Sequence, residues 1–235
     1  MFPLYDENRP LTKPIVNYVL IISNIIVFFY FYLQGELYFN ESVVKYGIIP
    51  LYVLSGKRLY TIITSMFMHG GLLHLFGNML YLYIFGDNVE DALGHLRYLI
   101  FYVLGGIGAS LIHILSILLM PEDLMIYSLR IPSVGASGAI SAVLGAYMLL
   151  YPYARIRTLV FSWWVTIISV PAYYYIGFWF IYQLFMGIMA LQLPMGVAFW
   201  AHIGGFVTGI IFIKSFNIRP RPRRRIIMPF YIPIE

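Results

Sequence analysis

The sequence predicts an all-α membrane protein, a bundle of six helices that each cross a bilayer. Composition is the first observation behind this fold class, because charged residues make up 11% of the 235 residues and hydrophobic residues 61%. Soluble domains carry roughly 25% charged residues, and ten acids with fifteen bases cannot form the polar surface that a soluble domain of this size needs. The composition therefore excludes a soluble enzyme, a nucleic-acid-binding protein and a disordered chain.

The second observation is the spacing of the charged residues. A helix needs about 20 largely uncharged residues to span a bilayer. Five runs without Asp, Glu, Lys or Arg are that long: residues 15–34, 59–86, 98–120, 131–154 and 158–213. The last run is too long for one helix and suits two, with Pro171 inside the first of them and a break near Leu193 and Pro194. We therefore expect six spans.

The third observation is how the basic residues divide between the two sides of the membrane. An even number of spans places both termini on one side, which holds eleven of the Lys and Arg residues. The opposite side holds only Lys45, Lys57, Arg58 and Arg130. Basic residues accumulate on the cytoplasmic side, so both termini are expected in the cytoplasm. The domains are then one membrane domain, residues 1–214, and a basic cytoplasmic tail, residues 215–235, that contacts the lipid bilayer.

The predicted spans contain no carboxylate, and the chain contains no cysteine. An aspartyl intramembrane protease needs two carboxylates at membrane depth, a zinc protease needs H-E-x-x-H or an equivalent string, and cation-coupled transporters usually carry an acid near the midplane. None of these patterns is present. Without cysteine there is also no thiol nucleophile, zinc–thiolate site or iron–sulfur cluster. We therefore predict neither a metal nor a cofactor.

Histidines are the ionisable groups that remain within or near the spans. His95 lies in a loop and is expected to be solvated, and His113 is expected to hydrogen-bond between helices. His69 is expected to serve structure rather than to line a cavity. His74 and Asn78 are four residues apart, so on a helix they share one face.

Two stripes of small residues predict a close contact between helices. In the first stripe two adjacent rows repeat every four residues: Ser137, Ser141 and Gly145, and Gly138, Ala142 and Ala146. In the second stripe Ala201, Gly205 and Gly209 repeat in the same way. Small residues at this spacing let membrane helices approach closely. If the two stripes meet, Ser137 and His202 can reach each other. The alternative is that each stripe serves packing alone.

A serine hydroxyl beside an imidazole is the minimal activated nucleophile, because the histidine takes the serine proton and later returns it to the leaving amine. No acid is available at that depth, so we expect a catalytic dyad of Ser137 and His202. The oxyanion needs hydrogen-bond donors. The backbone N–H of Ser137, the His74 ring and the Asn78 amide are the expected donors.

Four segments together resemble the rhomboid family of intramembrane serine proteases. They are TSMFMHGGLLHLFGNMLYLYIFGDNVE, GHLRYLIFYVLGG, GASGAIS with its G-x-S-G motif, and AHIGGFVTG. The resemblance implies a six-helix bundle with an outward-opening, water-filled polar cavity that has Ser137 and His202 at its floor. It also implies a serine endopeptidase that cleaves transmembrane segments of membrane proteins near the outer face.

The same resemblance sets the expected location and partners. We expect an integral multi-pass protein of a prokaryotic plasma membrane, whose partners are transmembrane protein substrates and the bilayer rather than nucleic acid. One alternative is a catalytically silent relative that binds membrane segments for chaperoning or degradation, and a transporter is another. The sequence leaves the substrate and the oligomeric state open.

Two positions depart from the family pattern. Rhomboids often have Trp-Arg shortly before the second span, where this chain has Tyr60 and Thr61. Many also have an aromatic residue four positions after the nucleophile, which stacks on the catalytic histidine, where this chain has Ser141. We therefore expect a different support for the His202 ring. Glu90, at the end of the second span, is expected to cap or brace neighbouring helices.

Overall fold

The structure, a computed structural model, describes residues 2–161 and 165–221. Ten α-helices and three strands lie in these ranges, with one short 3₁₀ helix at Ser65–Phe67. The helices are α1 (Ile15–Tyr32), α2 (Glu36–Tyr46), α3 (Pro50–Leu54), α4 (Thr61–Thr64), α5 (Leu72–Leu93), α6 (His95–Ile117), α7 (Glu122–Ser128), α8 (Ser137–Leu150), α9 (Ala172–Ala190) and α10 (Phe199–Ser215). The strands are β1 (Phe2–Asp6), β2 (Arg155–Phe161) and β3 (Val165–Pro171).

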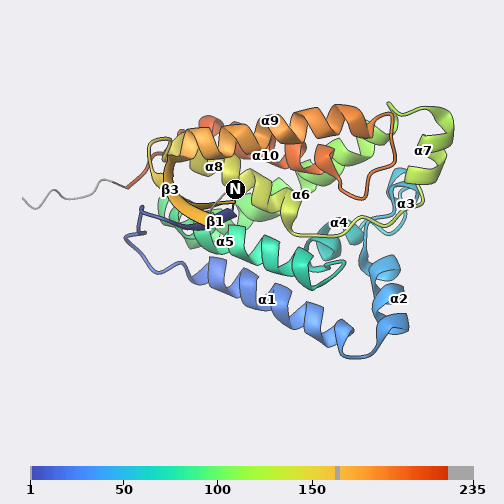
Figure 1. The fold of residues 1–235 in the computed structure, drawn as a ribbon. Helices are drawn as coiled ribbons and strands as arrows, with labels where there is room; N and C mark the ends of the chain where they lie inside the picture. The colour runs from blue at the N-terminus through green and yellow to red at the C-terminus, as the bar shows by residue number, and fades with distance from the viewer. Residues whose placement is uncertain (1, 162–164, 222–235) are drawn as a thin grey trace, which may run out of the picture.

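The long helices form one packed group (Figure 1). The buried helix α8 packs against α10, α6 and α5, while α1 packs against α5 and α9 against α10. Among the described residues, α1 and α6 are long and apolar enough to cross a membrane, and α8 and α10 are apolar but shorter. The mostly helical character is as predicted, whereas six membrane spans stay a prediction.

The fifth predicted span is wrong over its first part. Residues 155–161 and 165–171 form the paired strands β2 and β3 instead of a helix, and α9 begins only at Ala172, directly after Pro171. The segment RIRTLVF and the segment VTIISVP are rich in Val, Ile and Thr, which favour strands. Proline suits the start of a helix better than its interior. The predicted break near Leu193 and Pro194 is confirmed, because α9 ends at Ala190 and α10 begins at Phe199.

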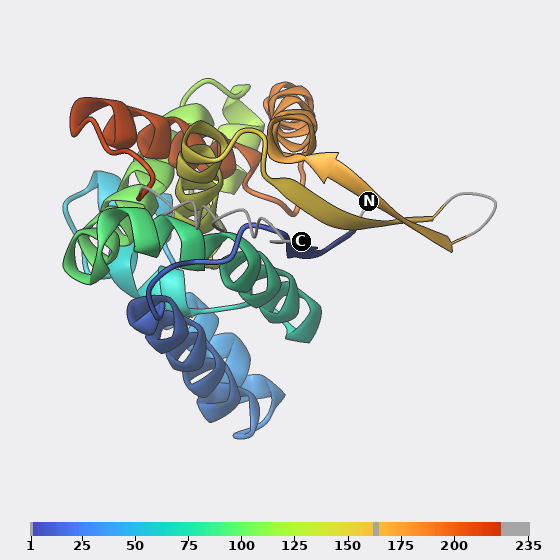
Figure 2. The same cartoon turned by 90° about the vertical axis from the view of Figure 1, so that its left-hand side faces the viewer.

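A three-stranded antiparallel sheet, in the order β1-β2-β3, is therefore added to the helices, so the expectation of an all-α chain is wrong here. The sheet lies between α5 and α9, and its hairpin projects away from the helices (Figure 2). The Phe2 ring stacks on Phe76 of α5 with centroids 6.4 Å apart, and Arg157 pairs with Glu7 at 2.6 Å. The sheet thus joins the start of the chain to α5.

In the second and fourth predicted spans, the long helix begins several residues after the start of the charge-free run. Residues 61–67 form α4 and the 3₁₀ helix before α5 begins at Leu72, and α8 begins only at Ser137. The loop between the first two predicted spans, residues 35–58, contains α2 and α3. Arg58 anchors this loop by donating to the carbonyls of Val44, at 2.7 Å, and Lys45. Arg58 therefore supports the loop where the family's Trp-Arg pair is missing.

The predicted contact between the two small-residue stripes is confirmed. A side-chain carbon on Gly205 would collide with the carbonyl of Gly138, and one on Gly209 would collide with the carbonyl of Ala142. The backbones of α8 and α10 therefore approach as closely as glycine allows. This contact places the first turns of both helices side by side.

The predicted bracing role of Glu90 is also confirmed. Its carboxylate is buried and accepts hydrogen bonds from the backbone N–H groups of Val16, at 3.0 Å, and Asn17, at 2.7 Å. The first N–H groups of a helix lack acceptors within the helix, and no side chain at the start of α1 caps them. Glu90 of α5 therefore caps α1 from outside.

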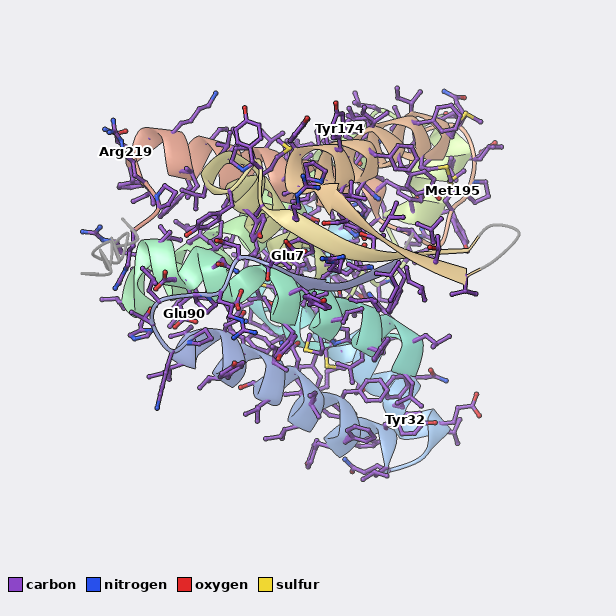
Figure 3. The ribbon with its side chains drawn as sticks, turned by 60° about the vertical axis from the view of Figure 1, so that its left-hand side comes forward. Glu7, Tyr32, Glu90, Tyr174, Met195 and Arg219 are labelled. Atoms are coloured by element: carbon purple, nitrogen blue, oxygen red, sulfur yellow. The ribbon has the colours of Figure 1, made fainter. Side chains whose placement is uncertain are left out.

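Figure 3 labels Glu90 and Arg219 near one end of the molecule, and Tyr32 and Met195 at the opposite end. We name these the Glu90 end and the Met195 end. The helix α10 ends at Ser215, where the predicted basic tail begins. Residues 222–235 of that tail lie outside the described residues, so the tail stays a prediction.

Candidate active site

Ser137 is the first residue of α8 and follows a loop that only glycine can form. Gly135 has φ +132 and donates its N–H to the Ser65 carbonyl at 2.9 Å. This φ strains any residue with a side chain. Because the first N–H groups of a helix have no acceptor within it, the N–H of Ser137 is directed away from α8 and can serve a ligand.

His202 lies in the first turn of α10, opposite Ser137. The Ser137 Oγ and His202 Nε2 atoms are 2.9 Å apart and form a hydrogen bond. This distance is what a general base needs to take the proton of a nucleophile. The glycine contacts between α8 and α10 hold the two helices at the separation that permits this bond.

The other ring nitrogen of His202 meets a residue that sequence reasoning missed. Nδ1 lies 2.8 Å from Oε1 of Gln183, whose side chain is 4% exposed on α9. An amide oxygen only accepts hydrogen bonds, so Nδ1 carries the proton and Nε2 is free to accept from Ser137. The only sequence signal for this role is a lone amide among the apolar residues of α9.

Aromatic rings also reach His202 from α9. The Trp179 ring lies 6.1 Å from the His202 ring, measured between centroids, and Phe199 of α10 approaches edge-on at 6.4 Å. Ser141, which stands where many relatives have an aromatic residue, instead donates its hydroxyl to the Ser137 carbonyl at 2.6 Å. The support of the His202 ring therefore comes mainly from α9 and not from α8.

His74 is held by the loop that precedes α5, and its ring lies against Gly135 in the loop that precedes α8. Its Nδ1 accepts the N–H of Gly70 at 3.3 Å, so the proton of the neutral ring is on Nε2. A side-chain carbon on Gly135 would come within 2.9 Å of the His74 ring and 3.5 Å of Ser137 Oγ. The absence of a side chain at Gly135 thus leaves open the space that borders both the His74 ring and the Ser137 hydroxyl.

Asn78 lies one turn further along α5 and lines the same cavity as Ser137 and His202. Its side chain is 7% exposed, and its amide nitrogen is buried without a hydrogen-bond partner among the described residues. Burying an unsatisfied donor is costly, about 1–3 kcal/mol. Such an exception calls for a reason, and a catalytic role is one of them.

The remaining histidines take different places. His69 is 1% exposed and packs its ring edge-on against His74, so a structural role fits it. His113 lines the cavity, and the predicted interhelical hydrogen bond of its ring is not found in the described part of the chain. His95 is half exposed and bonds to Glu90 through Nδ1.

One cavity of about 1250 Å³ contains Ser137, His202, His74 and Asn78 in its lining. It extends from α5 and α8 to the loop between α9 and α10. Within residues 2–161 and 165–221, no group of three or more His, Cys, Asp and Glu side chains is placed to hold a metal ion. The hydrogen bond between Ser137 and His202 is an arrangement that can perform nucleophilic attack by a serine hydroxyl with a neutral histidine as base.

Comparison with known proteins gives matches over most of the chain. The family model described as Rhomboid domain matches residues 56–216. The chain is 32% identical to RHOMBOID-like protein 6, mitochondrial, of Arabidopsis thaliana over 175 residues, which are 73% of this chain and 47% of that protein. It is 32% identical to Rhomboid protease GluP of Bacillus subtilis (strain 168) over 136 residues, 58% of this chain and 24% of that protein.

The chain spans about half or less of the length of these relatives. They come from a plant as well as a bacterium, so a prokaryotic plasma membrane and cytoplasmic termini stay predictions. The domain match and the order of the sequence motifs agree. The chain belongs to the rhomboid family and is a multi-pass membrane protein.

Proposed function

We propose that the chain is an intramembrane serine endopeptidase that cleaves transmembrane segments of other membrane proteins through a dyad of Ser137 and His202. The observation that carries this proposal is the 2.9 Å hydrogen bond between Ser137 Oγ and His202 Nε2. The printed name of the Bacillus relative, a rhomboid protease, supports the same reaction class.

In the proposed reaction, His202 Nε2 takes the hydroxyl proton while Ser137 Oγ attacks the carbonyl carbon of the scissile peptide bond. The tetrahedral intermediate breaks down as His202 donates that proton to the leaving amine, which leaves an acyl group on Ser137. A water molecule, deprotonated by His202, then attacks the acyl carbon, and His202 returns the proton to Ser137 Oγ as the bond between Oγ and the acyl carbon breaks and the acid product leaves. The cavity of about 1250 Å³ provides space for the substrate segment and for this water.

Three donors support oxyanion stabilisation beside Ser137. They are the Ser137 backbone N–H, the His74 Nε2–H and the unpartnered amide of Asn78. Donors that are fixed before the reaction stabilise the negative oxygen without reorganisation, and each is worth about 2.7–4 kcal/mol in the transition state. The unpartnered state of Asn78 is what such a donor requires before substrate arrives.

The membrane setting belongs to the same proposal. Six spans, a cavity open to the outer face and cytoplasmic termini are supported by the charge-free runs and by the excess of basic residues on one side. Hydrolysis needs water, and irregular backbone at membrane depth is tolerated where it lines a water-filled cavity. The loop around Gly135 is backbone of this kind.

A fluorophosphonate probe tests the proposal on the purified protein in detergent micelles. We expect covalent labelling at Ser137 and cleavage of a model transmembrane substrate, both unchanged by EDTA. Ser137→Ala and His202→Ala should each abolish both. Ser110→Ala is the matched control, because Ser110 lines the same cavity and donates only to the Gly106 carbonyl. A folded wild type that is neither labelled nor active would be a silent binder and would reject the proposal.

A further inference from the structure

We infer that Gln183 of α9 is a positioning residue that holds His202 in the tautomer and orientation needed to activate Ser137. This inference rests on the proposed function. It adds a neutral third member to the dyad, placed where serine proteases with three members carry a carboxylate.

The hydrogen bonds of His202 leave one consistent arrangement of protons. Gln183 Oε1 lies 2.8 Å from Nδ1 and Ser137 Oγ lies 2.9 Å from Nε2. Because the amide oxygen cannot donate, Nδ1 carries a proton, and in the neutral ring, which is the form that can act as a base, Nε2 then accepts from the serine. Without Gln183, nothing in this pair of contacts would disfavour the tautomer with the proton on Nε2, in which Ser137 has no base.

An amide fits this position better than a carboxylate would. Gln183 is 4% exposed, and an ionised carboxylate taken out of water loses several kcal/mol of solvation. A neutral amide provides the acceptor at much lower cost. It also stabilises the imidazolium less, so its contribution lies mostly in alignment.

The packing of α9 fixes where Gln183 stands. One turn after Gln183, the Gly187 carbonyl accepts the Trp200 indole N–H of α10 at 2.8 Å. One turn before it, Phe180 stacks on Phe206 of α10 with centroids 4.1 Å apart. Gln183 therefore lies between two anchors to the helix that carries His202. The pairing of the two side chains follows the docking of α9 on α10.

The role of the Gln183 amide can be tested by pH dependence, because the described groups around His202 include no carboxylate. The titratable side chains that interact with His202 are His74 of α5 and His113 of α6, whereas α8 presents Ser137 and α9 presents Gln183, neither charged. A carboxylate at position 183 would thus be a new charge beside the imidazole. It would favour the imidazolium.

The experiment compares Gln183→Leu, Gln183→Glu and wild type by the rate of fluorophosphonate labelling between pH 5 and pH 9, with thermal stability measured in parallel. Gln192→Leu is the matched control, because Gln192 is exposed just past the end of α9. Loss of the correct tautomer costs about 10⁴ in a protease whose third member is charged. For a neutral amide we expect Gln183→Leu to lower the rate per folded molecule by about 10–100-fold, with a lower melting temperature because the His202 Nδ1–H loses its acceptor.

Gln183→Glu tests for a positioning role, because a purely structural role of Gln183 would not change the pH dependence of labelling. A neutral imidazole is the base, so stabilising the imidazolium should shift the acid limb of the labelling profile to higher pH, with the rate at pH 9 retained. This shift is also decisive if Gln183→Leu fails to fold. An unshifted limb in Gln183→Glu, or a wild-type rate in Gln183→Leu, would overturn the inference while labelled wild type upholds the proposed function. An unreactive wild type would overturn both.

Discussion

Within its first two turns α5 carries His74 and Asn78, and within its last two turns it carries Asn88, Glu90 and Asp91. The first pair faces the candidate site with neutral groups, one of which has an unpartnered donor. The second group is buried, and each of its side chains forms hydrogen bonds to the start of the chain. At the Met195 end, α5 thus keeps a hydrogen-bond donor without a partner. At the Glu90 end, its polar side chains are hydrogen-bonded.

The engaged group holds the start of the chain against α5. Asp91 accepts the backbone N–H of Thr12 at 2.9 Å, and Asn88 donates to Asp6 at 2.9 Å. Together with the capping of α1 by Glu90, these bonds fix the segment between β1 and α1. The side chains of this end therefore serve stability.

The cost of charge explains why the two ends differ. Asp87 follows the charge-free run that ends at Gly86, and even there burial, with a further contribution from the charge of Asp6, raises the pKa of Asp87 to about 7. A charged group deeper in the membrane is costlier still. The chemistry proposed for the Met195 end accordingly uses serine, histidine and amides, with no carboxylate among the described groups around His202.

Among substitutions on α5, the largest effect is expected from Asn78→Ala, which removes the amide donor that has no partner among the described residues. If the amide acts mainly in the transition state, kcat for a transmembrane substrate should fall by about 10²–10³. The melting temperature should stay near that of wild type, since Asn78 makes no side-chain donor bond that the variant loses. A lower melting temperature with kcat per folded molecule intact would instead make Asn78 part of the packing.

Glu90→Gln tests the opposite end and should change stability instead of rate. The variant sets an amide N–H₂ against the backbone N–H groups of Val16 or Asn17, so one buried donor loses its acceptor. We expect the free energy of unfolding to fall by about 2–3 kcal/mol, as measured by thermal denaturation in micelles. The exposed Glu41→Gln on α2 is the control. A fall in kcat per folded molecule would show that the two ends of α5 are coupled.

Prediction from sequence succeeded where two segments carry the same pattern, because each segment then indicates the other as its packing partner. The stripes beginning at Ser137 and Ala201 each predicted a partner, and their contact brings Ser137 to His202. Gln183 has no such pattern, because a lone amide in an apolar helix does not reveal which helix it faces. Only the packing of α9 on α10 supplies that information.

The hairpin was missed for a different physical reason. The absence of charged residues predicts a membrane span, and residues 158–171 contain no charged residue, as a spanning helix would. Their β-branched composition favours strands, and β1 supplies the partner that turns the hairpin into a sheet. That partner lies more than 140 residues earlier in the sequence, as the pairing of Phe2 with Leu159 shows, so local patterns do not reveal it.

The smallest effect is expected from Asn88→Ala, the same substitution as Asn78→Ala ten residues further along α5. Asn88 is 1% exposed, donates to Asp6 at 2.9 Å and accepts from Asn8 at 2.7 Å. Losing these bonds should lower the free energy of unfolding by about 1–2 kcal/mol.

The rate of fluorophosphonate labelling per folded molecule should not change in this variant, because its contacts lie at the end of α5 away from His74. The exposed Asn40→Ala on α2 corrects for the substitution itself. The same substitution at two positions of one helix would then have different effects: Asn78→Ala would lower the reaction rate, and Asn88→Ala would lower the stability. If Asn88→Ala instead slows labelling at unchanged stability, the division of α5 into a reactive end and a structural end fails.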